Sequence, residues 1–228
     1  NLEQRGGSAL TIDDMNGHFD AIVFGELVPR KWMAGSDHFR RTEKNQRDYP
    51  DETASADELV QIAIVYKGTR VTIYRNAKKY ASHTIDSPQR FDINSVVLFG
   101  QRHLEEGGVS CYQGRIEDAR IYDKALTVGQ IAQLRPNKLS GLSPVAWWSF
   151  ENGRQSDLQG IFPDTYLAGG ARIVDGSLVL VGERATMIAT PAGLLANMLG
   201  QSSPDTEINA LIRSARTLRE KFLRDPYR

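Results

Sequence analysis

The sequence has little of what would place it at once in a chemical class. Cys111 is the one cysteine among 228 residues, which excludes an internal disulfide and a zinc site built on cysteines. No apolar run approaches the ~18 residues that a membrane-spanning helix needs. The 28 Lys and Arg residues balance 28 Asp and Glu residues, so net charge gives no reason to expect nucleic acid or an anionic membrane as a partner.

The familiar catalytic motifs are also missing. The four histidines are far apart in the sequence, and none forms a His-x-x-x-His or His-x-His pair that would indicate zinc. There is no Gly-x-Ser-x-Gly motif, and no glycine-rich loop stands before a helix to bind phosphate. Cys111 follows the pattern of a small core residue rather than a nucleophile. The sequence therefore predicts no catalytic residue.

What the sequence does contain is a series of short β-strands. β-Branched and aromatic runs are separated by Gly, Asn and Asp, and Lys67-Gly68-Thr69 and Asp175-Gly176 have the composition of tight hairpin turns. The predicted strands cover residues 19–24, 59–66, 70–75, 96–99 and 115–122 and, after Pro144, residues 145–150, 171–174, 177–181 and 186–189. Many short strands at near-even spacing predict an all-β antiparallel sandwich.

Helix is scarce until the C-terminus. Thr127 can cap a short helix that Pro136 ends. A second helix is predicted from Ser203, with Pro204 in its first turn. One face of that helix is apolar and consists of Ile208, Leu211, Ile212, Ala215, Leu218 and Phe222. We expect this face to pack on the sandwich or on a following domain, with a membrane-surface or calmodulin-binding helix as the alternative.

Four segments carry a more specific pattern. They are LVQIAIVY at 59–66, VTIYRN at 71–76, GRIEDARIYDKAL at 114–126 and Gln130-Ile131. Together they resemble the concanavalin A-like, laminin-G-like jelly roll, whose closing motif runs Gly-x-Ile-Asp-Glu-x-Arg-Ile-Tyr-x-x-Ala-Leu before a short helix. Two positions depart from that family: Ala77 replaces the glycine after Asn76, and Glu117-Asp118 replaces Asp-Glu. The resemblance implies a concanavalin A-like jelly-roll β-sandwich.

The elements of that family occur here in an unusual order. Segments similar to its opening strands, at 147–153, 169–172 and 176–182, follow the closing motif instead of preceding it. Because isolated strands would leave open edges, we infer a circular permutation. Residues 1–192 would form one sandwich, with 8–135 as its body and 145–190 as its completing strands. Residues 193–228 would be a helical linker. The alternative is two domains, of which the second is truncated.

The two ends of the sequence suggest a larger parent protein. The N-terminus has neither an initiator Met nor a signal sequence, as expected for a processed or excised piece. The last segment, 218–228, is similar to the approach to the catalytic propeller in levanase- and invertase-like glycoside hydrolases with an N-terminal jelly roll. This resemblance implies an accessory module of a secreted or periplasmic enzyme, with a catalytic domain downstream.

One segment combines an aromatic ring with several hydrogen-bonding groups. Trp32 is followed by Asp37, His38 and Arg40, next to a long polar loop at 40–58. Sugars bind to an aromatic face flanked by directed polar groups, so these four residues are the predicted carbohydrate site, for a fructan or a glucan. The alternative is that Trp32 belongs to the core and the others cover its rim.

A set of acidic residues near strand ends could supply oxygen ligands. Glu117, Glu151 and Asp157, with Asp118 beside the first, are the predicted ligands for Ca²⁺, the one cofactor that the sequence suggests. The alternative is that these acids are solvated turn residues, because Ca²⁺ needs six or more oxygens.

The sequence thus predicts a non-catalytic module that binds carbohydrate or supports a catalytic neighbour. A structural or protein-interaction spacer is the first alternative. A glucanase-like enzyme of the same fold is the second, although the paired glutamates of such enzymes, in a Glu-x-Asp-x-x-Glu pattern, are missing. Neither nucleic acid nor a membrane is an expected partner.

Overall fold

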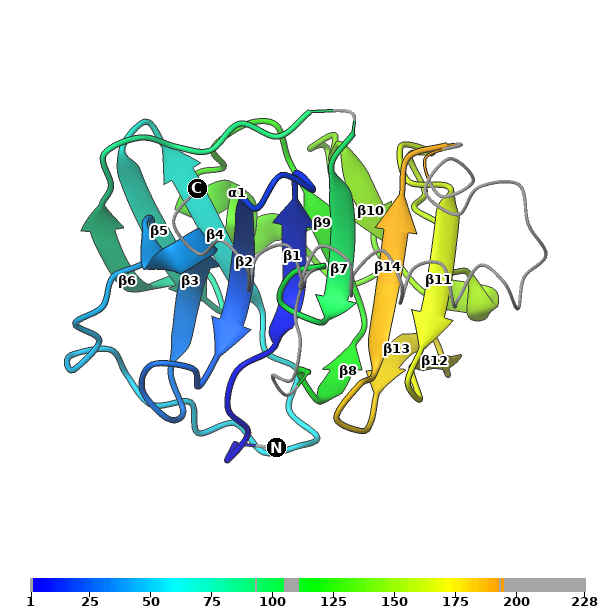
Figure 1. The fold of residues 1–228 in the computed structure, drawn as a ribbon, viewed down its shortest axis with the longest axis horizontal. Helices are drawn as coiled ribbons and strands as arrows, with labels where there is room; N and C mark the ends of the chain where they lie inside the picture. The colour runs from blue at the N-terminus through cyan, green and yellow to red at the C-terminus, as the bar shows by residue number, and fades with distance from the viewer. Residues whose placement is uncertain (1, 93, 105–110, 193, 195–228) are drawn as a thin grey trace, which may run out of the picture.

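The computed structural model describes residues 2–92, 94–104, 111–192 and 194. It is an antiparallel β-sandwich with very little helix, which confirms the predicted fold class (Figure 1). One layer is a continuous six-stranded sheet in the order β11-β14-β7-β1-β2-β3. Its strands are β1 (Ser8–Asp13), β2 (Phe19–Phe24), β3 (Trp32–Ser36), β7 (Val96–Gly100), β11 (Asp164–Ala168) and β14 (Thr186–Thr190).

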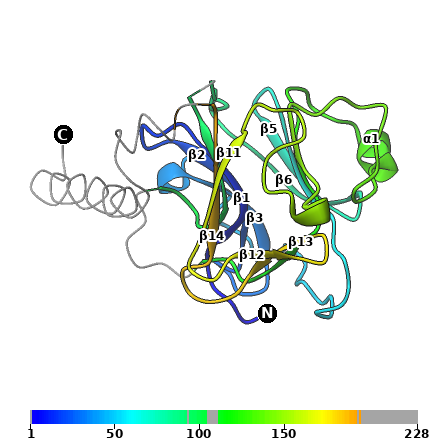
Figure 2. The same ribbon diagram turned by 90° about the vertical axis from the view of Figure 1, so that its right-hand side faces the viewer.

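The second layer is divided into three smaller sheets. They are β4 (Ile62–Lys67), β5 (Arg70–Arg75) and β6 (Lys78–Thr84); β9 (Ala119–Ile121) and β10 (Ala146–Trp148); and β8 (Gly114–Ile116), β13 (Ser177–Leu180) and β12 (Arg172–Val174). Figure 2 shows β5 and β6 of this layer to one side of the six-stranded sheet. The helical elements among the described residues are α1 (Val128–Gln133) and the short 3-10 turns η1 (Asp37–Phe39) and η2 (Glu151–Gly153). None of these helices is long and apolar enough to cross a membrane.

Local sequence signals account for several element boundaries. Thr127 caps α1 as predicted. Its hydroxyl accepts a hydrogen bond from the Gln130 N–H (3.3 Å), and the Gln130 side-chain oxygen accepts one from the Thr127 N–H (2.8 Å). Asp175 and Gly176 both have positive φ, 49° and 70°, as a tight turn between β12 and β13 requires. These signals set where the strands turn.

The best-packed interior lies where β13 and β10 face β7 and β14. Trp148 is fully buried and meets Phe99 edge to face, with ring centroids 5.3 Å apart. Leu178, Leu180 and Met187 are also fully buried in this cluster. This core joins residues from both layers and from distant parts of the sequence.

Strands from residues 145–190 lie in the same sheets as strands from residues 8–135. β14 pairs with β7 (Met187 opposite Phe99), β10 pairs with β9, and β13 pairs with β8. The predicted circular permutation and the domain boundary at residue 192 remain predictions. The helix predicted from Ser203 lies outside the described residues.

Candidate functional site

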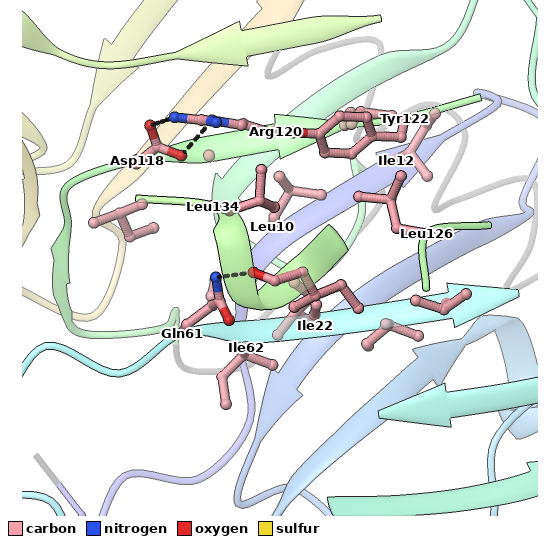
Figure 3. A pocket seen from close by; sticks show the side chains of 18 of the residues that line it. Leu10, Ile12, Ile22, Gln61, Ile62, Asp118, Arg120, Tyr122, Leu126 and Leu134 are labelled. Atoms are coloured by element: carbon pink, nitrogen blue, oxygen red, sulfur yellow. Dashed lines mark hydrogen bonds and ion pairs between the residues drawn. The ribbon is translucent and has the colours of Figure 1, made fainter. Parts of the chain in front are cut away.

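A cleft of about 1230 Å³ opens in the second layer between β4 and β9. We call it the central cleft. Its floor is the inner face of the six-stranded sheet, where Leu10, Ile12 and Ile22 are only partly covered (Figure 3). β4 forms one wall, and β9 with the segment that follows it forms the other. The lining is mostly apolar, so water leaves it readily when an apolar partner enters.

The central cleft exists because the second layer is not hydrogen-bonded across its width. Among the described residues β4 pairs with β5 alone, and β9 pairs with β10 alone. A hydrogen bond links the β4 side to α1, in which the Gln61 Nε2–H donates to the Ile131 carbonyl (3.3 Å, Figure 3). Ile131 is fully buried beside it. The two walls therefore face each other as strand edges.

The register of the β4–β5 hairpin shows which backbone groups face the central cleft. Lys67 and Arg70 flank a two-residue loop, and such flanking residues form a hydrogen-bonded pair. At the other end of the hairpin, the Asn76 N–H donates to the Gln61 carbonyl (2.8 Å), so Gln61 and Asn76 are also a hydrogen-bonded pair. Odd-numbered residues of β4 thus bond β5. Ile62, Ile64 and Tyr66 direct their N–H and C=O groups away from β5, toward the cleft.

The β9 wall also presents backbone to the central cleft. Trp147, opposite Arg120 in the β10–β9 pair, bonds away from β9: its N–H donates to Asp157 (3.0 Å) and its carbonyl accepts from the Leu158 N–H (2.7 Å). In an antiparallel ladder both members of such a pair point outward. The N–H and C=O of Arg120 therefore point away from β10.

The β9 wall is held by an ion pair. Asp118 faces Arg120 through two contacts of 2.9 Å and also accepts from the Trp147 Nε1–H (2.7 Å) and the Asn137 N–H (3.0 Å). The Arg120 guanidinium lies over the Trp147 ring, 4.4 Å from its centroid. Asp118 is thus fully engaged within the protein, and its role is to position the wall.

A second charged group lies at the floor of the central cleft. Arg41 is buried and bonds Asp20 (2.9 Å) and Asp37 (2.6 Å). Burial raises the pKa of Asp20 to about 6 in spite of the guanidinium beside it, since desolvation disfavours its charged form. Tyr66 on β4 lies close to this group, and burial raises its pKa well above the usual value. These residues tie β2 to η1.

The structure places Trp32 in the core. Its side chain is only 7% exposed, and its indole N–H donates to Glu52 (2.8 Å) while the ring packs on Phe24 at 4.7 Å. A stacked sugar needs an exposed ring face, so the sugar-stacking role predicted for Trp32 does not fit this position. The position fits the alternative interpretation, in which Trp32 is a core residue.

The other predicted sugar contacts are separated from Trp32 along β3. Asp37 is 2% exposed, and its carboxylate forms an ion pair with Arg41. His38, with φ of 47°, and Arg40 are exposed at the η1 end of the strand, opposite the Trp32 end. The structure therefore does not bring the four residues together on one surface, and glycan binding by the segment remains a prediction.

The acids predicted to bind Ca²⁺ are likewise not gathered. Within the described residues no group of three or more His, Cys, Asp or Glu side chains is placed to hold a metal ion. Asp157 is buried and accepts from the N–H groups of Trp147, Gln159 and Phe162, so it organises its own loop. Glu151 is exposed and accepts from the Asn137 side chain (2.7 Å), and Glu117 lies at the rim of the central cleft.

The sequence did not predict the ion pairs that hold the surroundings of Trp32 and Asp20. Glu52 binds Arg75 through two bonds (2.9 and 2.7 Å) as well as Trp32, and lies in the segment predicted to be a polar loop. Desolvation acts to raise its pKa, but the hydrogen bonds from Arg75, Ala54 and Trp32 outweigh it and lower the pKa to about 2. No spacing rule connects Glu52 to Arg75 or Arg41 to Asp20, because the pairs meet only in space.

Comparison with known proteins agrees with the architecture. Residues 16–132, just over half of the chain, match the family model Laminin_G_3, described as the concanavalin A-like lectin/glucanases superfamily. Comparisons with curated proteins and with solved structures found no significant match. The matched residues include β2 to β9, the elements that form both walls of the central cleft. The chain belongs to the concanavalin A-like lectin/glucanase superfamily.

Proposed function

We propose that the chain is a non-catalytic module of a carbohydrate-active protein, in which it supports a neighbouring module or binds carbohydrate. Membership of the superfamily fits either role. The observation that carries the proposal is the chemistry of the central cleft. Its inner acids, Asp20 and Asp118, are paired with Arg41 and Arg120, and its other acids, Asp92, Glu117 and Asp123, lie at the rim. Glycoside hydrolysis needs two carboxyl groups free to face a glycosidic bond.

The supporting role has the stronger physical basis. The floor of the central cleft is apolar, and Trp32 offers no exposed ring to a sugar. An apolar floor suits a polypeptide better than a glycan, whose hydroxyl groups would lose water without gaining partners. This observation favours the protein-interaction alternative over direct sugar binding at the cleft.

The identity of the parent protein belongs to the same proposal. The similarity of residues 218–228 to the segment before a levanase-like propeller supports a secreted or periplasmic glycoside hydrolase. The catalytic domain would then lie downstream, and the glycan would be a fructan or a glucan. His38 and Arg40, exposed at η1, are the contacts that remain for such a glycan.

A glycan array followed by calorimetry with fructan and glucan oligosaccharides tests the sugar-binding role. We expect no release of reducing sugar from levan, inulin or laminarin, and at most weak binding. That binding should disappear in a variant with His38→Ala and Arg40→Ala and persist in the control Arg47→Ala. Hydrolysis that one carboxylate substitution abolishes would contradict the non-catalytic proposal.

A further inference from the structure

The walls of the central cleft are two strand edges with no partner strand in the part of the chain that the structure describes. Ile62, Ile64 and Tyr66 on β4 direct backbone N–H and C=O groups into it, and Arg120 does so on β9. Unpaired backbone groups beside an apolar floor are costly to bury. An occupant that binds tightly must therefore satisfy them.

The spacing of these groups decides which occupant fits. Donors and acceptors that alternate every second residue along β4 match the edge of another extended backbone. An apolar small molecule offers no such series of groups, and the backbone groups of a helix are already hydrogen-bonded within the helix. A strand added to an exposed sheet edge satisfies the groups one by one, as in known peptide recognition by β-augmentation.

The floor and the mouth of the central cleft define the side chains of that strand. Alternate residues of an added strand would lie on Leu10, Ile12 and Ile22. The others would face the α1 segment, which also lines the cleft. At the mouth Leu59 and Ile161 are 55% and 45% exposed, so the apolar surface continues outward. The fitting sequence is apolar at every second position.

Charge at the rim restricts the occupant further. Asp92, Glu117 and Asp123 lie at the rim together with Arg115, Lys124 and Arg135, so the two signs balance. A balanced rim complements a segment of low net charge and gives no attraction to a polyanion. In addition, the hydroxyl groups of Tyr66 and Tyr122, one on each wall, are buried and have no hydrogen-bond partner among the described residues. Peptide carbonyls would give them acceptors.

We propose that the central cleft binds an extended strand of another polypeptide, apolar at alternate positions and nearly neutral, which adds to the β4 edge opposite β9. The inference rests on the proposed supporting role and names its partner class: a strand of the module or protein that this domain supports. Backbone bonds to β4 would supply affinity, and the contacts with Leu10 and Ile22 would select the sequence.

The test uses the whole 228-residue chain, labelled with ¹⁵N, and a capped peptide of sequence KTVTITVE. Fluorescence anisotropy measures binding, and amide hydrogen exchange is followed at Ile62, Ile64, Tyr66 and Arg120. We expect saturable binding and at least tenfold slower exchange at these amides. The matched control is the same peptide N-methylated at alternate residues, which cannot donate along one edge and should bind at least tenfold more weakly.

Two variants locate the binding. Ile22→Arg places a charge on the floor and should reduce affinity at least tenfold, whereas Leu139→Arg, at a residue 88% exposed and outside the cleft, should leave affinity unchanged. A thermal melt checks that both variants fold, and the N-methylated peptide tests the proposal without any mutation.

Three results would overturn the inference. They are the absence of binding, equal binding of the N-methylated peptide, or amides of β4 already protected in the free chain, which would mean that the chain fills its own cleft. None of these measurements uses a sugar, so their failure leaves the glycan experiments above to be judged separately.

Discussion

The interior of the sandwich is built in two different ways. Around Trp148, aromatic and aliphatic side chains from both layers are fully buried, and β10 and β13 close the second layer over β7 and β14. Around Ile22, the six-stranded sheet has the same kind of apolar inner face, but the second layer parts between β4 and β9. The difference teaches that this fold can be stabilised by one region while another keeps apolar surface available for contact.

The central cleft also holds two largely buried ion pairs. On the β9 wall, the side chains of Asp118 and Arg120 are only 16% and 5% exposed and brace that wall. Below the central cleft, Asp20, Asp37 and Arg41 are buried together. Buried ion pairs are costly to desolvate and contribute less to stability than apolar packing of similar volume. The ion pairs at the central cleft should therefore contribute less to stability than the apolar packing around Trp148.

Removing the well-packed region altogether should have the largest effect. A fragment 1–136 lacks β10 to β14, so β7, β8 and β9 lose the partners that the structure shows. We expect an unfolded or aggregating fragment without a cooperative thermal transition, because its apolar strands would have open edges. Circular dichroism and calorimetry provide the measurement. A fragment that melts cooperatively would show that residues 145–190 are not needed to complete the fold.

Single substitutions compare the two regions directly. Trp148→Ala should lower the free energy of unfolding by about 3–5 kcal/mol, because Trp148 is fully buried. Ile22→Ala, at a partly exposed side chain of the cleft floor, should cost about 1–2 kcal/mol. Urea denaturation of both variants gives the two values. Equal losses would mean that the cleft region is packed as tightly as the region around Trp148.

The pH dependence of stability tests two carboxyl groups, one below the central cleft and one beside Trp32. The pKa of Asp20 is raised by burial to about 6, so the folded state favours its neutral form, and this stabilising contribution is lost as pH rises from 4 to 6. Desolvation opposes ionisation of Glu52 too, but hydrogen bonds from Arg75, Ala54 and Trp32 lower its pKa to about 2. Its contribution is present above pH 4.5 and is lost as pH falls toward 2.

The two carboxyl groups should therefore give a stability maximum near pH 4–5. Denaturant midpoints measured from pH 2 to 8 test this expectation. Asp20→Asn should flatten the limb above the maximum, and Glu52→Gln should flatten the limb below it. If Asp20→Asn leaves the upper limb unchanged, another group is responsible for it.

The sequence predicted the fold from local signals. Strand composition, the Gly68-Thr69 and Asp175-Gly176 turns and the Thr127 cap depend on near neighbours, and the structure has each of them. The candidate site was not predictable in this way. The sequence around Trp32 is typical of a sugar-binding site, but in the fold Glu52 and Phe24 contact Trp32 and make it a core residue. The central cleft lies between β4 and β9, which do not pair with each other. Pairings that are distant in sequence leave no periodic signal.

The position of β7 has a consequence for biosynthesis. This strand lies between β1 and β14, with Phe99 opposite Met187, and each residue from Val96 to Phe99 is fully buried. During translation β1 is available to β7 early, whereas β14 emerges almost ninety residues later. Until β14 is made, the edge of β7 opposite β1 has no partner strand. That unpaired apolar edge of β7 is therefore a place where nascent chains can associate wrongly.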